Sequence, residues 1–283
     1  MLQQQDFHES YTYKTTPSRD LLVDVFPALT PSKGCIIFLH GGALLLGSRN
    51  DLPHSIVNFL TKEGWDVATL DYRLISECPI SEIVQDANDG CKFVKGNYET
   101  KPVIVCGYSA GAFLALQQGT LDTPVDGILA FAGYGDLGAE WYFTPSKFFI
   151  EYKNVDHVAA KIAASEPFST IEERIDLYVY LRQKGTWPHY ILGEQNLNNE
   201  IQRWSPIRHI PPTYPRTVLI HGDKDCDVPV ETSKEMSKAL SDHKIPHELI
   251  VLEELDHDLF QQLELPQVEA AWRRALSYLE PQN

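Results

Sequence analysis

The chain has 283 residues, of which 43% are hydrophobic and 22% are charged, so it carries enough apolar material for a real core, and disorder is excluded. Its formal net charge of −15 repels phosphate backbones and anionic lipid, so we expect no nucleic-acid partner. No apolar run approaches the roughly 20 residues that a membrane span needs, and the first residues lack the features of a secretory signal. We therefore expect a cytoplasmic protein without a membrane span.

Short apolar runs alternate along the chain with longer segments of helical periodicity. This alternation is typical of a mostly parallel sheet with helices on both faces, the α/β class. Strands are expected at about 7–14, 21–26, 35–40, 65–71, 102–106, 125–131, 217–221 and 247–252. The first two of these alternate enough to be antiparallel edge strands. Helices are expected at 52–62, 80–94, 110–118, 231–241 and 266–279.

The segment of residues 134–214 does not follow this alternation of strands and helices. It inserts roughly 80 residues where a connection between a strand and a helix needs far fewer. It contains a helix-like piece at 171–181 and many aromatic residues. We predict a single domain, residues 1–283, in which this segment forms a helical cap over one end of the sheet. Most of its aromatic residues should form the core of the cap, and Trp141 and Trp187 are candidates for contact with a substrate.

The clearest chemical motif is the pentapeptide Gly107-Tyr108-Ser109-Ala110-Gly111, which lies between an expected strand and an expected helix. A serine on such a sharp turn is held with its oxygen exposed, and small neighbours are needed because other backbone approaches closely. The N-terminus of the following helix favours the negative oxygen that forms when the serine attacks a carbonyl. Ser109 is therefore the candidate nucleophile.

A serine nucleophile needs a histidine base that is oriented by a carboxylate. His257 follows the last expected strand, and no other histidine does. The loop after the preceding strand contains Asp223, Asp225 and Asp227. Both loops leave the sheet at the carboxyl ends of strands, where open α/β folds place their sites. Position alone does not choose among the three aspartates.

A second glycine-rich segment, His40-Gly41-Gly42-Ala43-Leu44, follows the third expected strand. Backbone N–H groups that point at a developing oxyanion lower the barrier by about 3 kcal/mol each. We predict an oxyanion hole formed by the amides of Gly42, Ala43 and Ala110. The apolar Leu44 beside this hole is a further candidate for substrate contact.

Together these motifs resemble the α/β hydrolases of the hormone-sensitive-lipase-like carboxylesterase branch. The resemblance rests on His40 to Ala43, Asp71 to Leu74, the pentapeptide around Ser109, the string H-G-x-x-D-x-x-V-P from His221 to Pro229, and His257. It implies an α/β hydrolase fold and a catalytic triad of Ser109 as nucleophile, Asp225 as acid and His257 as base. It also implies that the Tyr-Arg-Leu segment is structural.

The sequence departs from the family pattern at two positions near the site. Ala43 stands where the family usually has a third glycine, and Tyr108, a further candidate for substrate binding, replaces a frequent acidic residue. These departures, and the short segment before His40, place the chain closer to compact carboxylesterases, acetyl esterases and kynurenine-formamidase-like hydrolases than to lipases.

The expected activity is hydrolysis of a carboxylic ester of a small, hydrophobic or aromatic substrate through an acyl-enzyme. No metal or organic cofactor is expected, since the five cysteines include no CxxC pair or zinc-like spacing. A thioesterase or lactonase that releases a polyketide-type acyl group, or a kynurenine-formamidase-like amidase, would use the same machinery. A ligand receptor on a hydrolase fold is the non-enzymatic alternative, which predicts loss of a triad member. The expected partner is a small ester or acyl compound, and the oligomeric state stays open.

Overall fold

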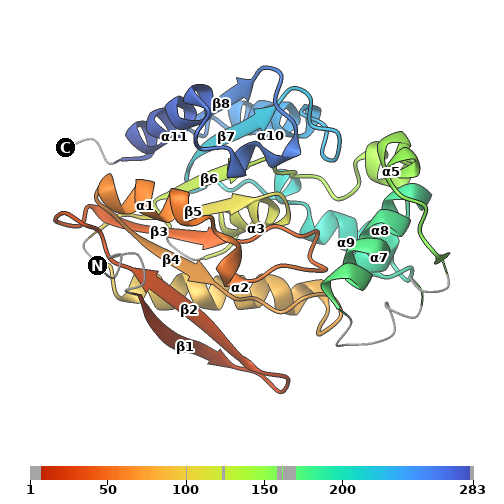
Figure 1. The fold of residues 1–283 in the computed structure, drawn as a ribbon, viewed down its shortest axis with the longest axis horizontal. Coiled ribbons are helices and arrows are strands. Elements are labelled where there is room, and N and C mark those ends of the chain that lie inside the picture. Colours follow the sequence, from red (N-terminus) through yellow and green to blue (C-terminus); the bar gives the residue numbers. More distant parts are fainter. Residues whose placement is uncertain (1–7, 100, 123–124, 158–160, 162–169, 281–283) are drawn as a thin grey trace.

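The computed structural model describes residues 8–99, 101–122, 125–157, 161 and 170–280. Within these residues eight strands form one sheet in the order β1-β2-β4-β3-β5-β6-β7-β8 (Figure 1). The strands are β1 (Glu9–Thr15), β2 (Asp20–Phe26), β3 (Gly34–Leu39), β4 (Trp65–Leu70), β5 (Val103–Tyr108), β6 (Gly127–Phe131), β7 (Arg216–Gly222) and β8 (His247–Leu252). The predicted α/β class, with a mostly parallel sheet, is confirmed.

Six neighbouring strands of the sheet run parallel: β4, β3, β5, β6, β7 and β8. β2 instead pairs antiparallel with both β1 and β4. The prediction that the second strand lies at an edge is therefore wrong, and β1 alone forms that edge. Phe7, the first residue of the first expected strand, lies outside the described residues. β5 extends two residues beyond its expected end because Tyr108 pairs with Phe131 of β6. This extension brings the strand directly to Ser109.

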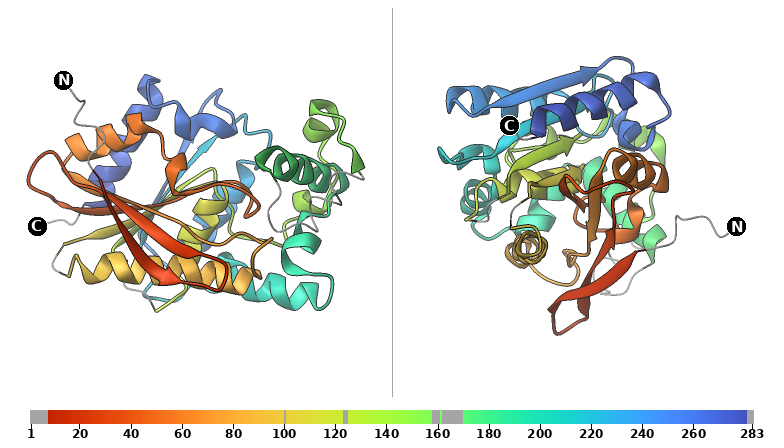
Figure 2. Two further views of the ribbon diagram at one scale, coloured as in Figure 1. Left: turned by 60° about the horizontal axis from the view of Figure 1, so that its bottom comes forward. Right: turned by 90° about the vertical axis from the view of Figure 1, so that its left-hand side faces the viewer.

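Helices cover both faces of the sheet, and each face has its own apolar core. One face carries α1 (His54–Lys62) and α11 (Pro266–Leu279), while the other carries α2 (Ile80–Gly96), α3 (Ala110–Gln118) and α10 (Glu231–Asp242) (Figure 2). The central strands are buried on both sides, which explains why they read as continuous apolar runs. The apolar stripe expected on the last helix is buried against the sheet.

The segment between β6 and β7 forms a group of helices beyond one end of the sheet (Figures 1 and 2). We call residues 134–214 the insertion; its residues 158–160 and 162–169 lie outside the described part. α7 begins at a capping box in which Thr170 and Glu173 bind each other's backbone N–H, and it ends at Gly185, whose φ is 65°. In its described part the insertion contains α4 (Glu140–Phe143), α5 (Lys147–Tyr152), α7 (Ile171–Lys184), α8 (Trp187–Leu192), α9 (Leu197–Trp204) and η3 (Pro206–Arg208).

The described part of the chain contains no helix that combines the length and the apolar character of a membrane span.

Candidate active site

Ser109 occupies the turn between β5 and α3, with φ 54° and ψ −118°. Its N–H donates to the carbonyl of Phe131 at 2.9 Å. A Cβ atom at Gly107 would lie 2.1 Å from the Gly111 carbonyl oxygen, and one at Gly111 would lie 1.9 Å from that of Leu39. Only glycine fits at these two positions, so the pentapeptide sequence is what permits the tight turn that presents the serine.

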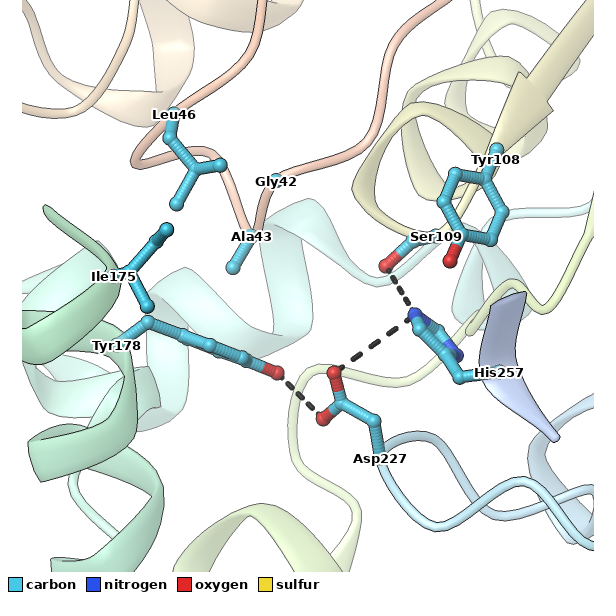
Figure 3. Close-up of a pocket in the computed structure, with 9 residues that line it drawn as sticks. All are labelled: Gly42, Ala43, Leu46, Tyr108, Ser109, Ile175, Tyr178, Asp227 and His257. Atoms are coloured by element: carbon cyan, nitrogen blue, oxygen red, sulfur yellow. Dashed lines mark hydrogen bonds and ion pairs between the residues drawn. The ribbon is translucent and has the colours of Figure 1, made fainter. Parts of the chain in front are cut away.

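His257 begins the short helix η4 (His257–Gln261), which follows β8. The side chain of Asp256 accepts the N–H of His257 at 2.7 Å and so fixes the start of this helix. The imidazole Nε2 lies 3.1 Å from Ser109 Oγ, and Nδ1 lies 2.7 Å from Oδ2 of Asp225. The three side chains therefore form a hydrogen-bonded line (the contact between Ser109 and His257 is drawn in Figure 3).

The side chain of Asp225 is fully buried in the loop after β7. Its Oδ1 accepts the backbone N–H groups of Asp227 and Val228 at 3.0 and 2.7 Å, and its Oδ2 also lies 3.1 Å from Nε2 of His221. Burial raises the pKa of Asp225, but the hydrogen bonds with His221 and His257 outweigh it and lower the pKa to about 2. The carboxylate is therefore ionised at neutral pH.

The other two aspartates of the loop have different partners. Asp223 accepts a backbone N–H from the loop after β8 at 2.7 Å. Asp227 accepts the hydroxyl of Tyr178 at 2.6 Å, and its Oδ2 lies 3.8 Å from His257 Nε2. Of the three candidates, Asp225 is thus the one that the structure brings into hydrogen-bond contact with Nδ1 of His257.

His221 is a site residue to which the sequence reasoning gave no role. It is fully buried at the end of β7, with Nδ1 2.7 Å from the Ser233 hydroxyl and Nε2 2.9 Å from the Val228 carbonyl. Its Nε2 also lies next to Asp225, so it helps to fix the carboxylate. The signal in the sequence was its place at the head of the H-G-x-x-D string.

The glycine-rich loop after β3 folds into a tight turn. The N–H groups of Leu45 and Leu46 close this turn by donating to the carbonyl of Gly42, at 2.9 and 3.0 Å. Gly42, Ala43 and Leu44 all have positive φ, at 108°, 54° and 62°. The family's usual glycine at the position of Ala43 fits this backbone, because glycine reaches positive φ without steric cost.

Gly42 and Ala43 line a pocket together with Ser109. Ala110 is the first residue of α3, and the first N–H groups of a helix have no acceptor inside it. The three predicted amide donors therefore lie around the serine, on the loop after β3 and at the start of α3.

The insertion holds this loop in place. Trp187 of α8 donates from its indole Nε1 to the carbonyl of Ala43 at 3.2 Å, and Arg174 of α7 donates to the carbonyl of Leu45 at 3.0 Å. On the other side, the hydroxyl of Tyr72 donates to the carbonyl of His40 at 2.6 Å, and the two rings stack. Tyr72 thus has a structural position, in line with the resemblance.

The pocket at Ser109 has a volume of about 230 Å³. Tyr108 lines it, with its ring 5.2 Å from that of His257. The expectation that Leu44 and Trp187 contact a substrate is corrected by the structure, since both are almost fully buried in the core. Trp141 lies instead under the guanidinium of Arg182, in a neighbouring groove that shares Asp227 with this pocket. Four further residues line the pocket, and none of them was among the predicted substrate contacts: Leu46, Ile175, Tyr178 and Asp227 (Figure 3).

Opposing effects set the pKa of His257. Burial lowers it, while the hydrogen bond with Asp225 and the negative charges of Asp227, Asp225 and Asp256 raise it and prevail. The net pKa lies above the ordinary value of 6.5. The site therefore stabilises the protonated imidazole that forms when His257 takes a proton.

Comparison with solved structures defines the class of the protein. A protein of unknown function from Staphylococcus aureus superposes with a TM-score of 0.81 at 25% identity, covering 96% of this chain and 98% of that one. An alpha/beta hydrolase superfamily protein from Enterococcus faecalis superposes with a TM-score of 0.75 at 23% identity, covering 98% and 99%. The fold is thus that of the α/β hydrolases, as the sequence motifs implied.

The chain belongs to the BD-FAE family, whose model matches residues 26–240. Among curated proteins, a probable isoprenylcysteine alpha-carbonyl methylesterase of Arabidopsis thaliana is 28% identical over 246 residues, which cover 82% of this chain and 47% of that protein. The chain spans about half the length of the curated relatives it matches. These relatives place it in the carboxylesterase-like branch of the fold.

Proposed function

We propose that the protein is a serine esterase that hydrolyses small carboxylic esters through an acyl-enzyme. The observation that carries this proposal is the hydrogen-bonded line from Ser109 through His257 to Asp225, next to a turn of backbone amides. A nucleophile, a base and an orienting acid in this arrangement perform acyl transfer on several unrelated folds. The membership of the family and the named esterases among the relatives support the same conclusion.

In the proposed first step, His257 Nε2 accepts the proton of Ser109 while Oγ attacks the ester carbonyl. Asp225 keeps the other ring proton on Nδ1, so that Nε2 is free to accept, and its charge stabilises the imidazolium. The raised pKa of His257 favours this proton transfer. The negative oxygen of the tetrahedral intermediate is stabilised by the amides of Gly42, Ala43 and Ala110.

The intermediate then collapses with loss of the alcohol, whose oxygen takes the proton from His257 Nε2. Water next attacks the acyl-enzyme with the same histidine as base, and the acid is released from Ser109. A pocket of about 230 Å³ is smaller than the pockets of drug-sized ligands. We therefore propose a short acyl group, packed against apolar neighbours such as Leu46 and Ile175.

Labelling with a fluorophosphonate tests the nucleophile. We expect the wild-type protein to be labelled and Ser109→Ala to be unlabelled and inactive. Ser241→Ala removes an exposed hydroxyl at the far end of α10 and serves as the matched control, which should be labelled like the wild type. Labelling that survives in Ser109→Ala would reject the proposal.

A substrate panel separates the esterase from its alternatives, since thioesterase, lactonase and amidase activities need the same triad. Initial rates on matched p-nitrophenyl ester, thioester, lactone and anilide substrates should be highest for the ester. A higher kcat/KM for the anilide would assign an amidase. Absence of turnover of every substrate by a folded, unlabelled protein would instead favour a receptor.

A further inference from the structure

Asp227 is a carboxylate in the pocket to which the proposed mechanism gives no role. It lies two residues after Asp225, lines the pocket at Ser109, and leaves 14% of its side chain exposed. Its Oδ1 accepts the hydroxyl of Tyr178 at 2.6 Å and lies 3.5 Å from Nε of Arg182. Its Oδ2 lies 3.8 Å from His257 Nε2, which is beyond hydrogen-bond distance. Figure 3 shows the carboxylate between Tyr178 and His257.

The surroundings leave this negative charge only partly compensated. The pocket walls nearby include the apolar side chains of Leu46 and Ile175. The guanidinium of Arg182 contacts Oδ1 through Nε at a longer distance than a good charge-assisted hydrogen bond, and it lies over the ring of Trp141, 4.6 Å from its centroid. A partly dehydrated carboxylate gains most from a further donor, and Oδ2 on the pocket side has acceptor capacity for one.

The chemistry of the reaction decides which half of a substrate meets this oxygen. In the proposed mechanism the leaving alcohol oxygen takes its proton from His257 Nε2 as the carbon–oxygen bond breaks, so the alcohol half lies at Nε2. Oδ2 of Asp227 is 3.8 Å from that nitrogen. A two-carbon spacer separates an alcohol oxygen from an amine nitrogen by about 3 to 4 Å at ordinary bond lengths. An amine on a short alcohol can therefore reach Asp227 while the oxygen faces His257.

We propose that Asp227 is a specificity-determining residue that selects esters of short alcohols bearing an ammonium group and disfavours esters of alcohols bearing a carboxylate. The inference rests on the proposed esterase function and adds to it the chemical class of the leaving group. It assigns Asp227 to substrate recognition and leaves the proton transfers with Ser109 and His257.

Three acetate esters of nearly equal shape test this selection. They are the esters of 2-(dimethylamino)ethanol, which is cationic at neutral pH, of 3-methylbutanol, its neutral counterpart, and of 3-hydroxypropanoate, which is anionic. A charge-assisted hydrogen bond predicts that the wild-type kcat/KM for the cationic ester exceeds that for the neutral one by about tenfold to 100-fold. The anionic ester should be the poorest substrate. Equal or higher kcat/KM for the neutral ester would overturn the proposal without any variant.

Asp227→Asn is the matched substitution, because it removes the charge and keeps an acceptor for Tyr178. We expect the ratio of cationic to neutral kcat/KM to fall to near one. Since both rates are measured on the same enzyme, changes in the histidine pKa or in the folded fraction cancel in this ratio. Asp258→Asn removes an exposed carboxylate next to His257 that does not line the pocket, and its ratio should equal that of the wild type.

Fluorophosphonate labelling of the same samples separates this inference from the proposed function. Labelling at Ser109 together with an unchanged ratio in Asp227→Asn would overturn the role of Asp227 and leave the esterase standing. A wild-type protein that is neither labelled nor active on any of the three esters would overturn the proposed function itself.

Discussion

Replacing Asp225 by asparagine should inactivate His257, the proposed base, because it changes which nitrogen of the imidazole carries the ring proton. Two backbone N–H groups donate to Oδ1 of Asp225, so the carbonyl oxygen of an asparagine must remain there. Its NH₂ group then takes the place of Oδ2 and points at Nδ1 of His257, 2.7 Å away. Nδ1 becomes an acceptor, the ring proton moves to Nε2, and the imidazole can no longer accept a proton from Ser109.

The size of the effect follows from the same contacts. The wrong tautomer and the loss of charge stabilisation should together reduce kcat by about 10⁴-fold, or roughly 5 kcal/mol of barrier. Stability should fall much less. The pKa of Asp225 is lowered from 3.8 to about 2, which corresponds to about 2 kcal/mol of stability. A lowered carboxyl pKa stabilises the fold above pH 4, so this contribution is present at neutral pH and absent from the asparagine variant.

The assay compares Asp223→Asn, Asp225→Asn and Asp227→Asn in parallel. Thermal unfolding confirms that each variant is folded, and initial rates with p-nitrophenyl acetate at pH 8 give kcat. Asp223→Asn is the matched control, since it removes a charge from the same loop without contact to His257. The role of Asp225 as the orienting acid is refuted if Asp225→Asn keeps more than a tenth of the wild-type kcat, or if Asp227→Asn has the lowest kcat of the three.

Three further predictions concern the groups around the triad. His257 must be neutral to act as a base and its pKa is raised above 6.5, so kcat/KM should fall on acidification with a midpoint above pH 6.5. The negative charge of Asp227 contributes to the raised pKa, so Asp227→Asn should move this midpoint to lower pH; pH–rate profiles measure both. Ala43→Gly relieves a side chain at φ 54°, so the free energy of unfolding should rise by up to about 1 kcal/mol, measured by urea titration. Trp187→Phe leaves the buried Ala43 carbonyl without its 3.2 Å donor, so stability should fall by about 1 to 3 kcal/mol and kcat should fall more than KM changes.

Each of these predictions has a distinct contrary result. A midpoint that stays in place in Asp227→Asn would show that this carboxylate does not act on His257. A loss of stability beyond 1 kcal/mol in Ala43→Gly would show that the positive φ carries no strain. Wild-type kcat and unfolding in Trp187→Phe would show that the indole does not hold the loop.

The sheet and the convergence of Ser109, His257 and the loop of Asp223, Asp225 and Asp227 could be predicted from the sequence because both rest on local rules. Buried parallel strands read as apolar runs, and the carboxyl ends of such strands meet at one edge. The serine was recognisable because Gly107 and Gly111 are required by backbone contacts closer than any Cβ allows. The choice among three aspartates was not local, since it depends on which carboxylate meets a histidine 32 residues away, and only the resemblance supplied it.

The pocket walls could not be predicted because they depend on conformations without a periodic signal. The sequence favoured Leu44 over Leu46, yet positive φ angles at Ala43 and Leu44 reverse the direction of the chain, so that Leu44 enters the core and Leu46 faces the pocket. Likewise, the sequence does not indicate whether an aromatic residue of the insertion packs into the hydrophobic core or lines the pocket. Trp187 lies inward, and its indole reaches the site only through the carbonyl of Ala43.

The contacts of α7 join the insertion to both loops of the proposed active site. Arg174 binds the loop that carries the predicted amide donors. One turn further along the same helix, the hydroxyl of Tyr178 donates to the side chain of Asp227, in the loop that carries Asp225. After another turn, Arg182 donates to the backbone carbonyl of Asp227 at 3.0 Å. One helix therefore spans the two loops on which the proposed chemistry depends. Because a shift of a few tenths of an ångström in α7 displaces both loops together, substitutions inside the insertion should alter turnover even where they touch no substrate.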